Sequence, residues 1–362
     1  MGSKGARRDP FQATYFMRHL KADVLTLPKL HTIVNVLEFT NEEFQTMRAY
    51  IALLIKALEE FSRNRGKKDG SANFVNVLSA LLRIRQVGIH PRLPNATQQI
   101  SNNKHAVGAK RKTASKDEEE DSDEEDEFQG ISAESTDLEA IKHLADGWAL
   151  STKFTHIRSN IRELTNGGGL LIYSSFSTPL RAINMMLKDI GVESVLYIGE
   201  TDAYERTVAL RRFKSGEVSV MLLTYGSGGT GLNLCPAGRA VLHLDTPWTP
   251  ASIRQATDRI HRFGTTHEIN EHILVAKSTT DDFIFNQVHR AKQHHMSKLD
   301  ALATSLKGLK AKTAASGMNA ENLQRMADWF KNQMYIFDQK LRREAEAAAA
   351  AAAEEAALKV EE

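Results

Sequence analysis

A series of short apolar runs between residues 170 and 276 decides the fold of this chain. The runs are LLIY (Leu170–Tyr173), VLYI (Val195–Ile198), VMLLT (Val220–Thr224), AVLHLD (Ala240–Asp245) and HILVA (His272–Ala276). Amphipathic segments of helical character lie between them. Continuous apolar runs separated by helices are the pattern of a parallel sheet that is buried on both faces. The stretch therefore predicts a doubly wound α/β fold.

Two of the loops that follow these runs carry unusual residues. After VMLLT comes TYGSGGTGLNL (Thr224–Leu234), which has the pattern of a glycine-rich turn entering a helix. After AVLHLD comes TPWTPASIRQATDRIHRFG (Thr246–Gly264), most of which is predicted to be a helix. Ligands of open parallel sheets bind in loops at the carboxyl ends of the strands. These two loops are therefore the candidate site.

The second loop places Gln255, Arg259 and Arg262 at spacings of four and three, so we expect one helical face to present all of them. A guanidinium is permanently charged and forks onto oxyanions, so the arginine pair suits a phosphoryl group. A solvated basic face on an ordinary helix explains the same spacing equally well. The glycine loop, taken alone, can serve only as a tight turn.

Taken together and in this order, the motifs resemble the C-terminal RecA-like lobe of superfamily two helicases, and within them the Swi/Snf-like DNA translocases. The stretches that carry the resemblance are LLIYSSF, YIGETDAYERTVALRRF, LLTYGSGGTGLNL, AVLHLDTPWTP and QATDRIHRFG. The HR pair in the last motif and the WTP tripeptide favour the Swi/Snf branch over RNA helicases of the DEAD type. The resemblance implies a RecA-like parallel sheet flanked by helices, with an N-terminal helical protrusion.

The resemblance also implies a nucleotide side, on which ATP and Mg²⁺ lie in a cleft between two lobes. Arg259 and Arg262 match arginines that reach the γ-phosphate, and such fingers are worth about 10³–10⁵ in rate in well-studied NTPases. Gln255 matches the motif glutamine on the nucleotide side. Gly229 and Gly231 match glycines that let the backbone approach the cleft. No metal ligand is predicted in this chain itself.

A DNA side follows from the same resemblance. Thr224 and Gly228 match positions whose hydroxyl and backbone amide meet strand phosphates, contacts that position the duplex without reading its sequence. Ser175 lies at the equivalent end of the first strand of the lobe. Trp248 matches a tryptophan that rests against the minor groove of double-stranded DNA, although a simple cap on the sheet edge is the alternative for this residue.

The chain also departs from the family pattern. Gly264 is followed by Thr265 and Thr266 where the family usually has glutamine, and Asp281 and Asp282 stand where it often has paired glutamates. These departures leave the expected fold intact and place catalytic efficiency in doubt.

What the sequence lacks bears on function as much as what it holds. ATP hydrolysis by a P-loop enzyme needs a G-x-x-x-x-G-K-[ST] loop, and none occurs in this chain. The resemblance covers roughly Phe11–His295 and starts after the first lobe. The chain is therefore expected to be the second half of a DNA-dependent ATPase that needs a P-loop-containing lobe and does not hydrolyse ATP alone. Two alternatives stay open: a non-catalytic DNA-binding module, and an interaction protein that works through an acidic segment.

Composition sets broad limits on the class of protein. The run Asp117–Glu127 contributes ten negative charges against a net charge of +2, which leaves +12 on the remainder and suits a polyanion such as DNA. The single cysteine, Cys235, fits a reducing compartment. No apolar run is long enough to span a membrane and no leader pattern opens the chain, so a nuclear or other intracellular location near DNA is expected.

Four domains are expected, with boundaries at 1–95, 96–136, 137–297 and 298–362. The first holds a strand (His31–Phe39) and two helical segments (Asn41–Phe61 and Ala72–Leu93). The second is expected to be a disordered insertion, in which Lys110–Lys112 is a candidate nuclear-import patch and Asp117–Glu127 a candidate binder of histones or other basic proteins; a solvated linker is the alternative. The third begins with helices, among them Lys153–Leu164, and closes with Thr279–His295. The fourth is a helical tail, with a helix at Asn319–Leu341.

Overall fold

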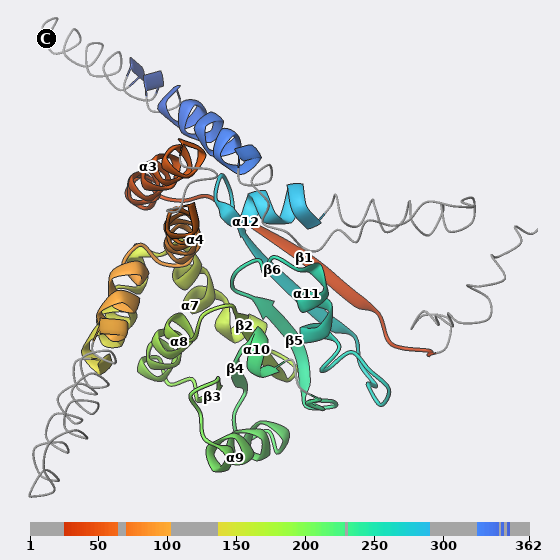
Figure 1. The fold of residues 1–362 in the computed structure, drawn as a ribbon. Coiled ribbons are helices and arrows are strands. Elements are labelled where there is room, and N and C mark those ends of the chain that lie inside the picture. The colour runs from red at the N-terminus through yellow and green to blue at the C-terminus, as the bar shows by residue number, and fades with distance from the viewer. Residues whose placement is uncertain are drawn as a thin grey trace, which may run out of the picture. The chain divides into compact units, whose positions relative to one another are not determined.

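The computed structural model describes residues 25–63, 70–102, 137–228, 231–289 and 324–339, together with 342–343 and 346–347. The chain divides into two compact units. The first contains Met1–Met47 and Arg83–Ala311, and the second contains Arg48–Leu82 and Lys312–Glu362. Figure 1 shows their elements.

The first unit is built on a six-stranded sheet whose strand pairs are all parallel. Its order is β1-β6-β5-β2-β4-β3. The strands are β1 (Leu30–Leu37), β2 (Gly169–Ser174), β3 (Ser194–Tyr197), β4 (Val220–Thr224), β5 (Gly238–His243) and β6 (Ile269–Ala276). The predicted parallel sheet is therefore confirmed, and the strand predicted at His31–Phe39 is its edge strand β1. Because all strands run the same way, their carboxyl ends share one edge of the sheet.

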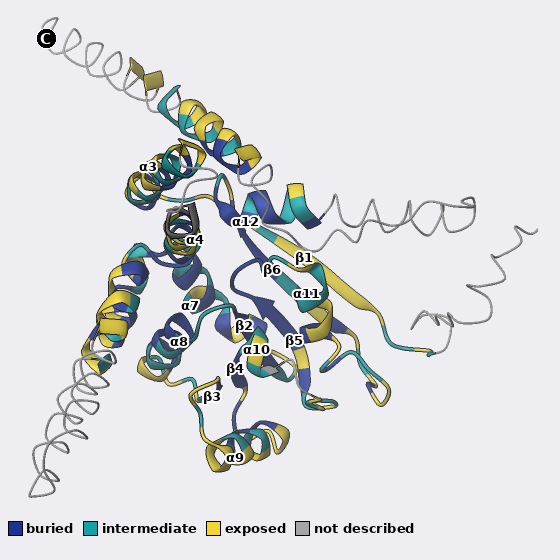
Figure 2. Ribbon diagram, viewed as in Figure 1, coloured by how far each residue is buried: buried dark blue, intermediate teal, exposed yellow. Residues whose placement is uncertain are grey.

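Both faces of the central strands are buried, which explains their continuous apolar runs. Along β2, Leu170 and Ile172 pack in one cluster with α7 (Thr152–Leu164) and α8 (Ser177–Asp189). Leu171 and Tyr173 point the other way and pack in a second cluster with α9 (Ala203–Lys214). Side chains alternate between the faces of a strand, so apolar residues are needed at every position. Figure 2 shows the resulting buried centre of the lobe.

Helix α7 has the amphipathic pattern that the sequence predicts. Its buried residues include Phe154, Ile157, Ile161 and Leu164, the four expected on one face. The helix begins after Ser151, whose side chain accepts a hydrogen bond from the backbone N–H of Phe154. This capping contact satisfies a donor that the first turn would otherwise leave without a helical partner.

The predicted helical protrusion consists of α3 (Asn41–Arg63) and α4 (Gly70–Val87). A capping box starts α3, because Thr40 N–H donates to Glu43 and Glu43 N–H donates back to the Thr40 hydroxyl. The Glu43 carboxylate also accepts from the backbone N–H of Thr152 at 2.8 Å, so it caps α7 as well. Within the second unit, Arg48 of α3 forms an ion pair with Asp338, which belongs to the helix at residues 324–339. The two charged groups are 2.6 Å apart.

Some expected boundaries are wrong. Residues 93–102 form a helix, although the sequence predicted an insertion from residue 96; Leu93 and Ala96 are buried against the α7 and α8 side of the sheet, and Ile100 packs on it. Among the described residues of the glycine-rich loop, Tyr225–Gly228 form the four-residue helix α10, and residues 231–237 are not helical. The closing helix is α12 (Thr280–Asp282) continued by a π-helical turn, η2 (Phe283–His289).

Several predicted features lie outside the described residues. They include Lys110–Lys112, Asp117–Glu127, the segment before Leu25 and most of the Ala/Glu-rich tail. In the described part of the chain, no helix combines the length and the apolar character that crossing a membrane requires.

Candidate functional site

Three of the predicted DNA-side residues lie at the carboxyl edge of neighbouring strands. Ser175 directly follows β2, Thr224 is the last residue of β4, and Trp248 lies in the loop after β5. Since β2 lies between β4 and β5 in the sheet, the fold brings these three segments to one edge. Ser175, Thr224 and Trp248 are all half-buried.

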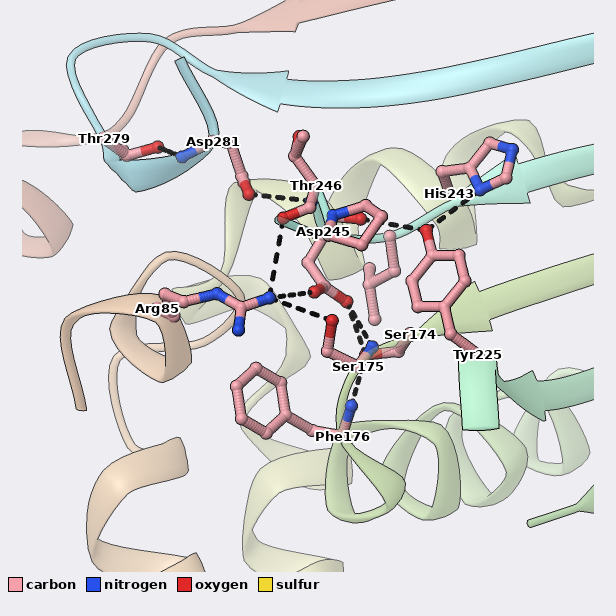
Figure 3. Close-up of polar contacts among 12 residues, drawn as sticks. Arg85, Ser174, Ser175, Phe176, Tyr225, His243, Asp245, Thr246, Thr279 and Asp281 are labelled. Carbon is pink, nitrogen blue, oxygen red and sulfur yellow. Dashed lines mark hydrogen bonds and ion pairs between the residues drawn. The ribbon is translucent and has the colours of Figure 1, made fainter. Parts of the chain in front are cut away.

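Asp245 ties the loops after β2 and β5 together (Figure 3). Its Oδ1 accepts from the Ser174 hydroxyl at 2.7 Å and from the backbone N–H of Ser175 at 2.8 Å. Its Oδ2 accepts from Nη2 of Arg85, the last arginine of α4, at 3.1 Å. The aspartate side chain is only 2% exposed, so these donors replace the water that a carboxylate would otherwise bind.

A second buried ion pair supports the same loop. Nζ of Lys153, at the start of α7, contacts the Asp281 carboxylate and donates to the backbone carbonyl of Leu244 at 2.6 Å. Asp281 also accepts from the backbone N–H of Thr246 at 3.0 Å. Burial raises the pKa of Asp281, and the positive charge of Lys153 opposes that shift. The pair therefore fixes the backbone on both sides of Asp245.

Aromatic rings line the inner side of this edge. The Tyr225 hydroxyl donates to the backbone carbonyl of Asp245 at 3.1 Å and lies 2.9 Å from Nδ1 of His243. Tyr225 and His243 stack with their ring centroids 5.9 Å apart, and Tyr173 stacks on Tyr225 at 5.5 Å. Burial and the nearby negative charge of Asp245 raise the pKa of Tyr225 well above its usual value, so its hydroxyl stays a donor.

Thr224 is held within its own loop. Its hydroxyl lies 2.7 Å from that of Ser227 and accepts from the Ser227 backbone N–H at 3.3 Å. The Ser227 hydroxyl in turn donates to the Tyr197 carbonyl of β3 at 2.6 Å. Because the Ser227 proton goes to Tyr197, the Thr224 hydroxyl donates to the Ser227 oxygen, and this contact fixes its orientation.

The arginine segment, which we define as Asp258–Gly264, differs from its prediction. Helix α11 covers only Pro250–Thr257, so Gln255 is helical and exposed, whereas Arg259 and Arg262 lie in the turns that follow and are half-buried. The expectation that one helical face presents all three is wrong. The reason is tertiary: the Arg259 carbonyl accepts from the N–H of Leu234 at 3.1 Å, and the Ile260 carbonyl accepts from the Thr265 hydroxyl at 2.5 Å.

The three glycines predicted as site residues differ in what the structure shows of them. Gly228 ends α10, and Gly229 lies outside the described residues. Gly231 is exposed with a φ of +46°, and a Cβ added there would meet nothing within 4 Å of the chain. Its requirement inside this chain is therefore the left-handed backbone conformation, not space for a close approach.

The residues that hold this edge together carry no clear signal in the sequence. Arg85 lies in the predicted helical segment Ala72–Leu93, but nothing in the sequence marks it as a partner of Asp245. Lys153 carries no signal of its own, because a lysine next to an amphipathic stripe usually faces water. Asp281 stands out in the sequence only as a departure from the family pattern. No sequence spacing links these residues, since their partners are 128 and 160 positions away.

Known proteins share this architecture. Residues 152–264 match the family model described as the helicase conserved C-terminal domain. The ATP-dependent helicase fft3 of Schizosaccharomyces pombe is 24% identical over 302 residues, which cover 77% of this chain and 32% of that protein. The chain thus spans about a third of the length of this curated relative.

Solved structures are similar in fold. The C-terminal part of the Fun30 ATPase domain has a TM-score of 0.55 and 19% identity, and the match covers 86% of this chain and 99% of that one. The Sulfolobus solfataricus SWI2/SNF2 ATPase core in complex with dsDNA has a TM-score of 0.52 and 19% identity, covering 84% of this chain and 52% of that one. At these identities the likeness concerns the fold. Residues 152–264 thus match the helicase conserved C-terminal domain, and the described lobe has a RecA-like fold similar to that of the C-terminal part of Swi2/Snf2 ATPases.

Proposed function

We propose that this chain supplies the second lobe of an ATP-dependent translocase that moves on double-stranded DNA, of the kind used in chromatin remodelling or DNA repair. One observation carries the proposal: the chain holds a helicase C-terminal domain but no G-x-x-x-x-G-K-[ST] sequence. ATP and Mg²⁺ then require a second, P-loop-containing lobe, either in a partner or elsewhere in a longer polypeptide.

On the nucleotide side, the proposed fingers are Arg259 and Arg262, with Gln255 beside them and Gly229 and Gly231 in the neighbouring loop. Two half-buried guanidinium groups form a donor set that suits the oxygens of a triphosphate. ATP would supply the phosphoryl group. The arginine N–H groups would donate hydrogen bonds to the phosphoryl oxygens, on which negative charge develops. If the partner lobe presents the nucleotide to these arginines, their side chains need to move little before the reaction.

On the DNA side, the proposed contacts are Ser175, Thr224, Gly228 and Trp248. Ser175 and Thr224 have hydroxyls of fixed orientation at one edge of the sheet. Such groups suit backbone phosphates, which position a duplex without selecting a sequence. The similar Sulfolobus core was solved in complex with dsDNA, which supports double-stranded DNA as the ligand class. Asp117–Glu127 is proposed to bind histones or other basic proteins in the nucleus.

The first experiment identifies the missing lobe. The chain is pulled down under native conditions from its own cells, and the co-purifying proteins are identified by mass spectrometry. A stoichiometric partner that carries a P-loop supports a split ATPase. If the natural polypeptide proves longer and contains the P-loop itself, the same assays are made on that polypeptide. Absence of a P-loop in both overturns the proposal in favour of a non-catalytic DNA-binding module.

The second experiment tests the fingers in the completed enzyme. Arg259→Ala is expected to lower the ATPase rate in the presence of duplex DNA by about 10³-fold or more, while DNA binding stays nearly unchanged. The matched control is Arg254→Ala, an exposed arginine of α11 one turn earlier, which should retain the rate. Equal rates for both variants would refute the assignment.

The third experiment uses the chain alone with a fluorescein-labelled duplex of random sequence, about 30 base pairs long, enough for several helical turns. Thr224→Ala is expected to weaken binding about two- to tenfold, as loss of one hydrogen bond does. Thr207→Ala removes an exposed hydroxyl from α9 that is not among the proposed DNA contacts, and is the control. Binding by the parent chain should fall steeply with salt, since phosphate contacts release counterions.

A further inference from the structure

Arg85 occupies a position where three segments meet. It belongs to the last turn of α4, and its guanidinium reaches the loops after β2 and β5. Nη2 donates to the Ser175 hydroxyl at 2.9 Å and to Asp245 at 3.1 Å, and lies 3.5 Å from the Thr246 carbonyl. The side chain is 11% exposed, so these protein acceptors replace most of its water.

The same guanidinium faces two aromatic rings. Its central carbon lies 5.3 Å from the centroid of Phe176 and 5.7 Å from that of Trp248. A cation within about 6 Å of a ring centroid is attracted by the electron-rich face of the ring. Phe176 belongs to the loop after β2 and Trp248 to the loop after β5. One planar group therefore contacts an aromatic residue of each loop.

The partners of Arg85 are themselves fixed. The Ser174 hydroxyl and the Ser175 backbone N–H both donate to Oδ1 of Asp245, the oxygen that Arg85 does not contact. The backbone N–H of Phe176 donates to the Ser174 hydroxyl at 3.1 Å. The chain around Ser175 and Phe176 is thus held even before Arg85 is considered. The ring contact with Arg85 also joins Trp248 to this cluster.

We infer that Arg85 is a positioning residue, which holds the Trp248 ring and the Ser175 hydroxyl in place at the carboxyl edge before DNA arrives. The inference rests on the proposed function for its consequence in DNA binding. Two features of arginine are needed together. The charge pairs with Asp245, and the planar fork reaches Ser175 while it lies against the rings. Lysine supplies the charge without the plane, so Arg85→Lys separates the two.

The first readout concerns Trp248 without DNA. The chain has three tryptophans, and Trp148→Phe with Trp329→Phe leaves Trp248 as the sole reporter. In this background, Arg85→Lys is expected to raise the acrylamide quenching constant of Trp248 about twofold or more as the ring is released. Arg83→Lys is the control, because Arg83 lies on the same helix and bonds Gln86 and the Pro94 carbonyl. Equal quenching in the two variants would overturn the inference.

The second readout is binding of the same fluorescein-labelled duplex. Arg85→Lys and Trp248→Ala are each expected to weaken it about two- to tenfold, and the double variant no further than Arg85→Lys alone, because the ring that Trp248→Ala removes is already out of position in Arg85→Lys. Fully additive losses would show that Arg85 acts independently of Trp248. Circular dichroism and the urea midpoint check that each variant is folded, and Arg85→Gln repeats the measurements if Arg85→Lys is not.

The two proposals can fail separately. If Arg85→Lys alters Trp248 quenching but Trp248→Ala leaves DNA binding unchanged, Arg85 positions the ring and the proposed DNA role of Trp248 is wrong. If Trp248→Ala weakens binding but Arg85→Lys changes neither quenching nor affinity, the DNA role stands and the inference is refuted.

Discussion

The two loops proposed to act are built in opposite ways. The β5 loop, which we define as Asp245–Trp248, has Asp245 and Thr246 almost wholly buried and bonded to α4, α12 and the loop after β2. The arginine segment Asp258–Gly264 is less buried: Ile260 is buried and both arginines are half-buried, but Asp258 and Gly264 are exposed and Phe263 is 81% exposed. The β5 loop is therefore fixed mainly by buried polar contacts, whereas the arginine segment leaves more of its residues exposed to solvent.

The largest effect is expected from breaking the support of the β5 loop. Lys153→Met leaves Asp281 as a buried carboxylate without its cation, and removing one partner of a buried pair costs about 3–5 kcal/mol. The free energy of unfolding should fall by that amount in urea titrations at pH 7. Lys142→Met, at an exposed lysine, is the control. Adding Asp281→Asn should restore part of the loss, and an unchanged stability of Lys153→Met would show that the pair does not hold the loop.

A pH dependence comes next, from His90 beside α7. The fully buried ring accepts from the N–H of Arg92 through Nδ1, so Nε2 carries the proton and donates to the Gly147 carbonyl at 3.0 Å. Burial lowers the pKa of His90 from 6.5 to about 4. Between these two pKa values the unfolded chain therefore binds a proton at His90 and the folded chain does not. The free energy of unfolding consequently falls as the pH falls, by about 3 kcal/mol in total.

The measurement is a set of urea titrations across that range. In His90→Gln the loss between pH 6.5 and about 4 should be smaller by about that amount, whereas His143→Gln, at an exposed histidine, should keep it. An identical pH profile for parent and His90→Gln would contradict the assignment.

A smaller effect is expected in the glycine loop. Gly231→Ala forces a side chain into the left-handed region and should lower the free energy of unfolding by about 1–2 kcal/mol. Gly226→Ala, at an exposed glycine of α10 without positive φ, is the control and should cost nothing comparable. An unchanged stability of Gly231→Ala would show that the loop around residue 231 adapts to a side chain without cost.

The smallest effect is expected at Gln255. Its side chain is exposed on α11, so Gln255→Ala should change the free energy of unfolding by less than about 0.5 kcal/mol. The same titration on Arg254→Ala gives the baseline for an exposed residue of this helix. A loss above about 1 kcal/mol would show that Gln255 stabilises the fold, which its exposed position does not predict.

The sequence predicted the parts of the fold that repeat a simple pattern. Runs such as VMLLT could be assigned to buried strands because every position is apolar, and α7 because Phe154, Ile157 and Ile161 recur at helical spacing. The helix at residues 93–102 was not predicted, because its few apolar residues among polar ones show only a weak helical periodicity. The end of α11 could not be predicted, because the N–H of Leu234 donates to the carbonyl of Arg259. This contact comes from an earlier part of the chain, and no local sequence pattern indicates it.

The candidate site was predictable only as far as motifs reach. Ser175, Thr224 and Trp248 were placed at one edge by the rule for parallel sheets, and the structure has their segments there. The buried pairs that support them were not predictable, since charged residues are usually exposed and only the folded neighbourhood makes Lys153 or Arg85 an exception.

The pairing of β1 with β6 has a consequence for how the protein is made. The Thr32 hydroxyl of β1 donates to Glu271 of β6, 239 residues later. At about 5–20 residues per second, β1 leaves the ribosome roughly ten to fifty seconds before β6, its neighbour in the described sheet, exists. Strands β2 to β5 can assemble during that interval, so β1 joins last. A nascent chain stalled before residue 269 should therefore hold a partly formed sheet beside an apolar strand that a ribosome-associated chaperone can bind.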